Sequence, residues 1–147
     1  MQSDDTQKKL SDIDRELIER RIYELAELRA RGDVAGMLRY AAPDIVIRCG
    51  DRRDYPFHAP REGKEAAGEF GHVVNIAYEN LGSEITSLLI DGDRVALHRT
   101  ATIRNRGTGN TVKIDFCNFL RFRDGLVVEF SEYADTAAFA RLESSEA

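Results

Sequence analysis

Three polar residues interrupt stretches that are apolar on one face, and their side chains could carry out acid–base chemistry. They are Arg99, Asn118 and Glu132. Around each of them apolar and polar residues alternate, which indicates a β-strand with one buried face. Each of the three residues stands at a position that places its side chain on the apolar face. A polar group on a buried face costs free energy unless it is paired. We interpret Glu132 as an acid or base, Arg99 as its electrostatic partner and Asn118 as a hydrogen-bond donor to a ligand oxygen.

The first hairpin turn decides whether Arg99 meets Asn118. The two residues lie on consecutive predicted strands that are joined through the sequence RGTGN. A two-residue turn at 108–109 would place Arg99 directly opposite Asn118.

The second hairpin turn decides where Glu132 lies. A three-residue loop over 123–125 would put Glu132 opposite Phe116 and diagonal to Asn118, within about 8 Å between α-carbons. We prefer this loop because a two-residue turn at 124–125 would place the two apolar faces on opposite sides of the hairpin. The three polar residues are then neighbours. A buried ion pair with Asn118 as its satisfied neighbour would explain the same pattern without any catalysis.

The elements that must position these residues come as helices first and strands second. Helical spacing of apolar residues predicts helices over about 11–30, from 34 to before Pro43, and over about 63–78. Asp33 and Asp135 are predicted N-caps, the latter of a last short helix. Strands are predicted at 45–49, 84–90, 94–105, 111–123 and 126–133. The inner face of the third helix is predicted from its spacing as Ala66, Phe70, Val73, Val74 and Ala77.

This order predicts an α+β fold, in which a curved antiparallel sheet packs on three N-terminal helices as a cone whose inner face is a pocket wall. The loop over 50–62 could close over the mouth of this pocket with Tyr55, Phe57 and His58, although a surface loop with one buried aromatic ring is the simpler interpretation. Cys49 ends the first strand and could face the pocket. The predicted pocket wall consists of Leu25, Cys49, Tyr55, Phe57, Phe70, Leu97, Ala101, Phe116, Leu120 and Phe130.

Composition narrows the class of protein. The chain has 147 residues, 42% hydrophobic and 32% charged, with a formal net charge of −5, which is ordinary for one globular domain and does not favour nucleic acid as a partner. We expect one domain over residues 10–143 between a disordered tail at 1–9 and a short tail at 144–147.

Two cysteines make no disulfide framework, no apolar run suits a membrane span, and no secretory signal is evident, so we expect a cytoplasmic protein. HxxxH, HExxH and CxxC spacings do not occur, and the glycines of RGTGN precede a strand, so neither a metal nor a phosphate-bearing cofactor is expected.

The predicted outer face of the strands is half apolar. It carries small or apolar residues at Ala96, Thr100, Thr102, Cys117 and Phe119 among charged ones. Such a face predicts a homodimer that forms sheet to sheet, and cover by the chain's own terminal helix is the alternative.

Several loose motifs occur in a specific order: ARGDVAGMLRYAAPDIVI after the first helix, REGKEAAGEF at the third, then DGDRVAL and FLRFRDGLVVEFSEYAD. In this order and spacing, over residues 12–142, the chain resembles the ketosteroid isomerase and nuclear transport factor 2-like superfamily, which includes SnoaL-like polyketide cyclases and limonene epoxide hydrolase. The resemblance implies a cone-shaped α+β fold, usually dimeric, around a hydrophobic pocket.

The resemblance does not carry a known catalytic set onto this chain. By spacing, Leu25, Cys49 and Asn118 stand at the positions where the isomerases have their catalytic tyrosine and two carboxylic acids. Of the epoxide hydrolase residues, the arginine matches Arg99 and a later aspartate matches Glu132.

Two functions follow. The first is a cofactor-independent isomerase, cyclase or hydrolase that acts on a small, mostly apolar ligand through Glu132. The second is a non-catalytic module of the same fold that binds a small ligand or dimerises, because fold does not fix function.

Overall fold

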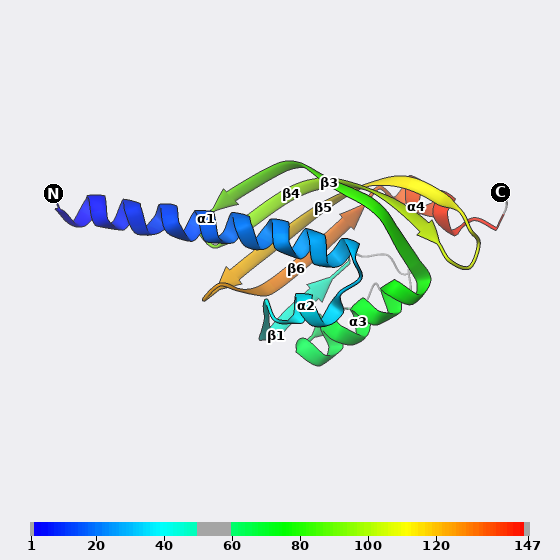
Figure 1. Ribbon diagram of the computed structural model, residues 1–147, viewed down its shortest axis with the longest axis horizontal. Coiled ribbons are helices and arrows are strands. Elements are labelled where there is room, and N and C mark those ends of the chain that lie inside the picture. The colour runs from blue at the N-terminus through cyan, green and yellow to red at the C-terminus, as the bar shows by residue number, and fades with distance from the viewer. Residues whose placement is uncertain (1, 50–59, 146–147) are drawn as a thin grey trace.

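The computed structural model describes the backbone of residues 2–49 and 60–145, and side chains from residue 14 onward within these ranges. The elements follow one another in the order predicted, helices first and a strand meander second (Figure 1). They are α1 (Gln2–Ala30), α2 (Val34–Leu38), β1 (Ala41–Arg48), β2 (Arg61–Glu62), α3 (Lys64–Ala77), β3 (Tyr78–Asp91), β4 (Arg94–Asn105), β5 (Thr111–Arg123), β6 (Leu126–Ala134) and α4 (Thr136–Glu143). No described helix is long and apolar enough to cross a membrane.

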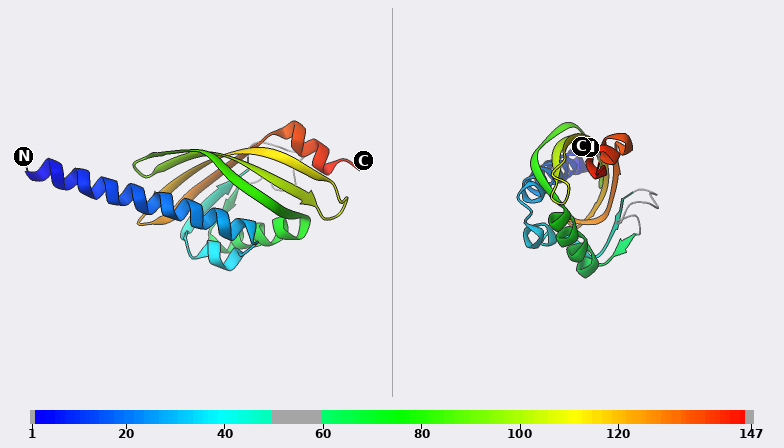
Figure 2. Two further views of the ribbon diagram at one scale, coloured as in Figure 1. Left: turned by 45° about the horizontal axis from the view of Figure 1, so that its top comes forward. Right: turned by 90° about the vertical axis from the view of Figure 1, so that its right-hand side faces the viewer.

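One curved six-stranded sheet, in the order β2-β1-β6-β5-β4-β3, forms the body of the molecule. In the end-on view of Figure 2 it bends into an open trough, with α1, α2 and α3 along the open side. Strands β3 to β6 form the predicted antiparallel meander, but β1 pairs parallel to β6, with Ile47 opposite Phe130. The sheet is therefore mixed, and the expectation of a wholly antiparallel sheet is wrong in this one pairing. The α+β class and the packing on three helices are confirmed.

Two apolar clusters fill the trough. One joins α1 to the middle of the sheet through Ile18, Ile22, Ala41, Ile45, Ala67, Val95, Leu97, Leu120, Phe122 and Val127. The other joins α3 and α4 to the far end through Val74, Tyr78, Ala101, Ile103, Ile114, Phe116, Ala138, Phe139 and Leu142. α4 therefore packs beside inward-facing residues of β4 and β5, and within the described part of the chain the outer-face residues Cys117 and Phe119 are exposed.

Both predicted N-caps are present. The Asp33 carboxylate accepts from the backbone N–H of Gly36 at 2.8 Å, and Asp135 accepts from Ala137 and Ala138 at 3.1 and 3.2 Å. These bonds satisfy donors that a helix start would otherwise leave without partners.

Several boundaries differ from prediction. α1 begins at Gln2 rather than near residue 11, and β1 and β3 begin earlier than predicted, at Ala41 and Tyr78. The short strand β2 was not predicted. Val73, assigned to the inner face of α3, is 46% exposed, because α3 turns Ala67 and Gly68 inward together with the correctly predicted Val74. The expected domain bounds of 10–143 remain a prediction.

The first hairpin has a longer turn than predicted. The backbone N–H of Asn105 donates to Asn110 across a four-residue turn, and the Asn105 side chain accepts from Gly107 and Thr108. Leu97 is therefore opposite Asn118 and Arg99 is opposite Phe116, so the direct pairing of Arg99 with Asn118 is wrong. The observed pairing of β4 with β5 is shifted by two residues from the predicted one. Because side chains alternate with a period of two, this shift leaves each side chain on its predicted face.

The second hairpin has a two-residue turn, so the predicted three-residue loop is also wrong. Asp124 and Gly125 have positive φ angles of 53° and 76°, the signature of a type I′ turn. The register then shifts between Arg121 and Phe122, which leaves Val128 as the extra residue of a β-bulge. The extra residue exchanges the inner and outer faces of β6 beyond the bulge. Glu132 therefore returns to the inner face, directly opposite Asn118.

Candidate functional site

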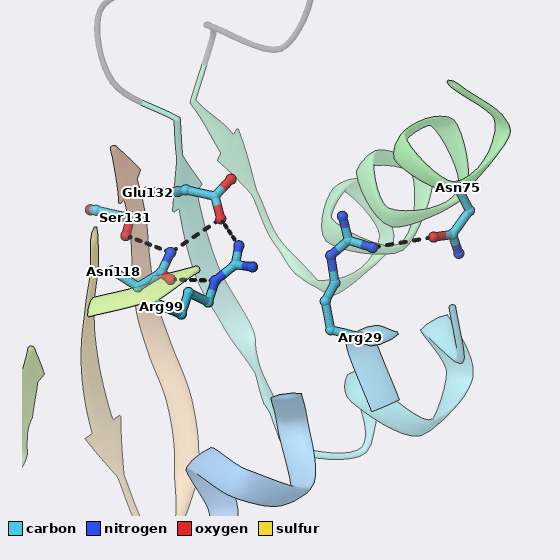
Figure 3. A network of polar contacts seen from close by, with 6 residues as sticks. All are labelled: Arg29, Asn75, Arg99, Asn118, Ser131 and Glu132. Atoms are coloured by element: carbon cyan, nitrogen blue, oxygen red, sulfur yellow. Dashed lines mark hydrogen bonds and ion pairs between the residues drawn. The ribbon is translucent and has the colours of Figure 1, made fainter. Parts of the chain in front are cut away.

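Arg99, Asn118 and Glu132 form one polar cluster on the inner face of β4, β5 and β6 (Figure 3). Arg99 Nη2 lies 2.6 Å from Glu132 Oε1, and Arg99 Nε donates to Asn118 Oδ1 at 2.9 Å. Asn118 Nδ2 donates to Glu132 Oε1 at 3.2 Å and, more weakly, to the Ser131 carbonyl at 3.5 Å. The predicted proximity of the three residues is confirmed, although through a different register.

Each side chain of the cluster is held from several sides. The Arg99 guanidinium lies 4.2 Å from the centre of the Phe116 ring, a cation–π contact. The Arg99 and Glu132 side chains are only 13% and 19% exposed, and Asn118 is 2% exposed. Charges this far from water need fixed partners, and each of the two charged groups supplies one to the other.

Among the described residues, one carboxylate oxygen and one guanidinium nitrogen of the cluster have no hydrogen bond. All hydrogen bonds of Glu132 involve Oε1, so Oε2 remains for a ligand. Arg99 uses Nε and Nη2, which leaves Nη1. Both amide hydrogens of Asn118 already have acceptors. The geometry therefore favours Arg99 as the donor to a ligand oxygen and Asn118 as the residue that orients the pair.

A cavity of about 210 Å³ lies between the cluster and the helices. Of the predicted wall, it is lined by Leu25, Phe70, Leu97, Phe116, Leu120 and Phe130, together with Arg99, Asn118 and Glu132. Cys49 and Ala101 are buried but do not line it. Tyr55, Phe57 and His58 lie outside the described residues. Many further lining residues are apolar, among them Ile22, Ile45, Ile47, Val74, Ile85 and Ile103.

Cys49 is an inert thiol in this setting. Burial, reinforced by the Glu132 carboxylate, raises the pKa of Cys49 to about 12, against a smaller opposing effect of Arg29 and Arg61. A thiol with so high a pKa is almost entirely protonated near neutral pH and is a poor nucleophile.

Arg29 is a cavity residue that the sequence interpretation missed. Its side chain comes from the end of α1, and Nη1 donates to Asn75 Oδ1 of α3 at 3.4 Å (Figure 3). Asn75 is itself anchored, because its Nδ2 donates to the Gly32 carbonyl at 3.0 Å. Arg29 follows Leu25 by one helical turn, so the spacing that placed Leu25 at the pocket also places Arg29 there.

The two described histidines and Cys117 lie away from the cavity. His72 and Cys117 are exposed, and His98 lies on the outer sheet face between Thr86 and Asp115. Within residues 14–49 and 60–145, no group of three or more His, Cys, Asp or Glu side chains is arranged to hold a metal ion.

Comparison with known proteins places the chain in a family. One similar solved structure is an NTF2-like (nuclear transport factor 2-like) protein from Burkholderia xenovorans, with a TM-score of 0.72 and 23% identity over 88% of this chain and 97% of that chain. A second is an epoxide hydrolase of the LEH-like type from M. tuberculosis, with a TM-score of 0.67 and 15% identity over 84% of this chain and 86% of that chain. A third is a protein with a ketosteroid isomerase-like fold from Catenulispora acidiphila in complex with trimethylamine, with a TM-score of 0.71 and 15% identity over 83% of this chain and 91% of that chain. At these identities the likeness shows the fold alone. No curated protein matches the chain. The model of the SnoaL-like domain matches residues 20–130, so the chain belongs to the SnoaL-like family.

Proposed function

We propose that this protein is a cofactor-independent enzyme that acts on a small, mostly apolar carbonyl compound, with Glu132 as the acid or base. The observation that supports it is the arrangement of Glu132 and Arg99 at the wall of a largely apolar cavity. One carboxylate oxygen is held by Arg99 and Asn118, and the other has no hydrogen bond within the described part of the chain. A held carboxylate with one available oxygen is what proton transfer requires.

Each residue of the cluster has one role in this proposal. A ligand carbonyl oxygen would accept from Arg99 Nη1, whose charge stabilises the negative charge that develops when the neighbouring C–H loses its proton. Glu132 Oε2 would take that proton and return it at another position, which is an isomerisation. Alternatively, the carbanion would attack a second carbonyl carbon of the ligand to close a ring, the C=O π bond would break, and Glu132 would give its proton to the new alkoxide. Asn118 would keep both charged groups in place, since it bonds to each of them.

The size of the cavity limits the ligand. A volume of about 210 Å³ is small for a ligand pocket, so the cavity favours a small ligand. We therefore expect ligands of the size of a single substituted ring rather than a four-ring steroid.

The alternative is a non-catalytic module that binds a small ligand. The observation in its favour is that the Glu132 charge is already matched by Arg99 at 2.6 Å. A pair of this kind can stabilise a fold without taking part in any reaction.

A thermal-shift screen followed by product analysis tests the proposal. Small ketones, lactones and epoxides that bind the native state should raise its melting temperature, and products of the binders can be identified by mass spectrometry and NMR. Glu132→Gln should abolish turnover by about 10²–10⁴-fold while it still binds the ligand. The matched control is Glu129→Gln, because Glu129 is also on β6 and pairs with an arginine, Arg121 at 3.2 Å, outside the cavity. Equal turnover in all three proteins would refute the role of Glu132, and binding without turnover of any ligand would favour the non-catalytic module.

We also propose that two copies pair through the outer sheet face. Phe119 and Tyr133 are 54% and 55% exposed there and contact each other edge to face, next to the exposed Cys117. Light scattering should give the mass of a dimer, and Phe119→Glu should give that of a monomer. A wild-type monomer at micromolar concentration would refute the pairing.

The two cysteines are both free, which supports a proposal that the protein works in a reducing cytoplasm. Fractionation of the source cells would test it, and recovery outside the cytoplasm would refute it.

A further inference from the structure

The last helix contributes an aromatic ring to one end of the cavity. α4 lies at the end of the sheet that is far from the start of α1 (Figure 1). From α4, Phe139 lines the cavity, and its ring contacts the ring of Tyr78 edge to face, with 5.8 Å between the ring centres. Tyr78 is the first residue of β3 and also lines the cavity. The two rings therefore join α4 to β3 at this end.

The residues beyond Phe139 belong to the closed core. Leu142 follows Phe139 by three positions on α4, and both lie in one apolar cluster with Ile114 of β5. Leu142 and Ile114 are 0% exposed and do not line the cavity, whereas Phe139 does. The cavity therefore ends at the layer that contains the Phe139 ring.

We propose that Phe139 is a specificity-determining residue whose ring sets the length of the ligand that the cavity accepts. This proposal rests on the proposed function, because it takes the cavity as the substrate site. It narrows the substrate class to ketones that carry only a short apolar group on the side away from the carbonyl. Ketones with a second ring at that position would be rejected.

Phe116 connects this end of the cavity to the polar cluster. The Arg99 guanidinium lies 4.2 Å from the centre of the Phe116 ring, and Phe116 lies in the same apolar cluster as Phe139. A ketone whose oxygen accepts from Arg99 would extend along Phe116 toward Phe139. The part of the ligand opposite its carbonyl would then meet the Phe139 ring, and a bulky group there would overpack the interior.

Phe139 is held in place by the attachments of its helix. The Tyr78 hydroxyl donates to the Glu143 carboxylate at the end of α4, and Asn110 Nδ2 donates to the Ser144 carbonyl at 2.6 Å. Phe139 itself is only 5% exposed. A long ligand could displace the ring only by breaking such contacts or by forcing a buried side chain away from its preferred rotamer. Discrimination by length is therefore expected.

Two ketones of different length test this role. They are 4-methylcyclohexanone and 4-phenylcyclohexanone, with dissociation constants measured by calorimetry. Wild-type protein should bind the methyl compound at least about 10-fold more tightly, because the phenyl group has no room. Phe139→Ala removes a phenyl ring from the protein, so it should bind the phenyl compound about 10–100-fold more tightly than wild type does, and the methyl compound within about threefold. Phe139→Leu, which removes less volume, should gain less.

Leu142→Ala is the matched control, because Leu142 is fully buried on the same helix without lining the cavity. It should lower the melting temperature, as Phe139→Ala should, but it should keep the wild-type preference for the methyl compound. An equal gain in affinity for the phenyl compound in Leu142→Ala would assign the effect to a loosened α4 and would overturn the role of Phe139.

Other results would also overturn this role. Equal affinity of wild type for both ketones would do so, as would a wild-type preference that both Phe139 variants retain. Loss of a cooperative thermal transition in both variants would show that the ring is needed for folding rather than for selection. In each of these cases the proposed function would stand if wild type turns over short ketones and Glu132→Gln does not. Binding of neither ketone by any of the proteins would contradict both proposals.

Discussion

The Arg99–Glu132 pair should have a coupling free energy between those of exposed and buried ion pairs. Its atoms Nη2 and Oε1 lie 2.6 Å apart, and its side chains are 13% and 19% exposed. Exposed pairs contribute about 0.2–1 kcal/mol, whereas removal of one partner from a fully buried pair costs about 3–5 kcal/mol. We therefore expect a coupling of about 1.5–3 kcal/mol in the free energy of unfolding.

A double-mutant cycle with Arg99→Met and Glu132→Gln measures this coupling. Arg99→Met also removes the cation–π contact with Phe116 and the hydrogen bond to Asn118, so alone it should cost about 3–4 kcal/mol. Those additional losses occur with and without Glu132, so the cycle cancels them to first order. Urea unfolding at one fixed protein concentration is the assay, and an unchanged m-value shows that the two states being compared are the same.

The control cycle uses the Arg121–Glu129 pair, which joins β5 to β6 in the same sheet. Its side chains are 33% and 46% exposed at a separation of 3.2 Å, so its coupling should be below about 1 kcal/mol. A coupling below about 0.5 kcal/mol for Arg99 and Glu132 would refute the reasoning, because it would mean that the two charges do not depend on each other.

Three further predictions follow from other parts of the chain. Iodoacetamide near pH 8 should modify Cys49 only after unfolding, because the Cys49 pKa is raised to about 12; rapid modification of Cys49 in native protein would contradict this. Asp135→Ala should lower the free energy of unfolding by about 0.5–2 kcal/mol in urea titrations, because it removes the N-cap of α4; no loss would show that α4 does not depend on this cap. Arg123 lowers the pKa of Asp44, so the stabilisation from Asp44 is present above the usual aspartate pKa and is lost as the pH falls through the lowered value; Asp44→Asn should be less stable than wild type at pH 7 and equal to it in strong acid, and a difference that persists in strong acid would rule out this linkage.

The sequence was sufficient for the faces of the strands but not for their register. Arg99, Asn118 and Glu132 were identified because side chains alternate with a period of two, which is a local property. The two hairpins, by contrast, depend on which of several turns the same residues adopt. Asp124 takes a positive φ of 53° in a two-residue turn, which alone would have reversed the faces of β6. The bulge at Val128 restores them. Neither is evident from alternation.

Long-range pairings were beyond the sequence as well. The parallel pairing of Ile47 with Phe130 joins segments about 80 residues apart, and no local pattern specifies it. Arg29 was overlooked because an arginine in the last turn of a helix is also explained by its favourable interaction with the helix dipole. Its place at the cavity depends on the position of α3, whose Asn75 accepts a hydrogen bond from it.

Exchange of ligand α-hydrogens with deuterium measures proton transfer at Glu132 most directly, because it does not require the product to be known. Small cyclic ketones that bind the protein would be incubated in D₂O and followed by NMR. If Glu132 Oε2 is the base, the wild-type protein and Glu129→Gln should accelerate exchange, and Glu132→Gln should slow it by about 10²–10⁴-fold. Exchange at the same rate in wild type and Glu132→Gln, with the ketone bound to both, would contradict the central claim.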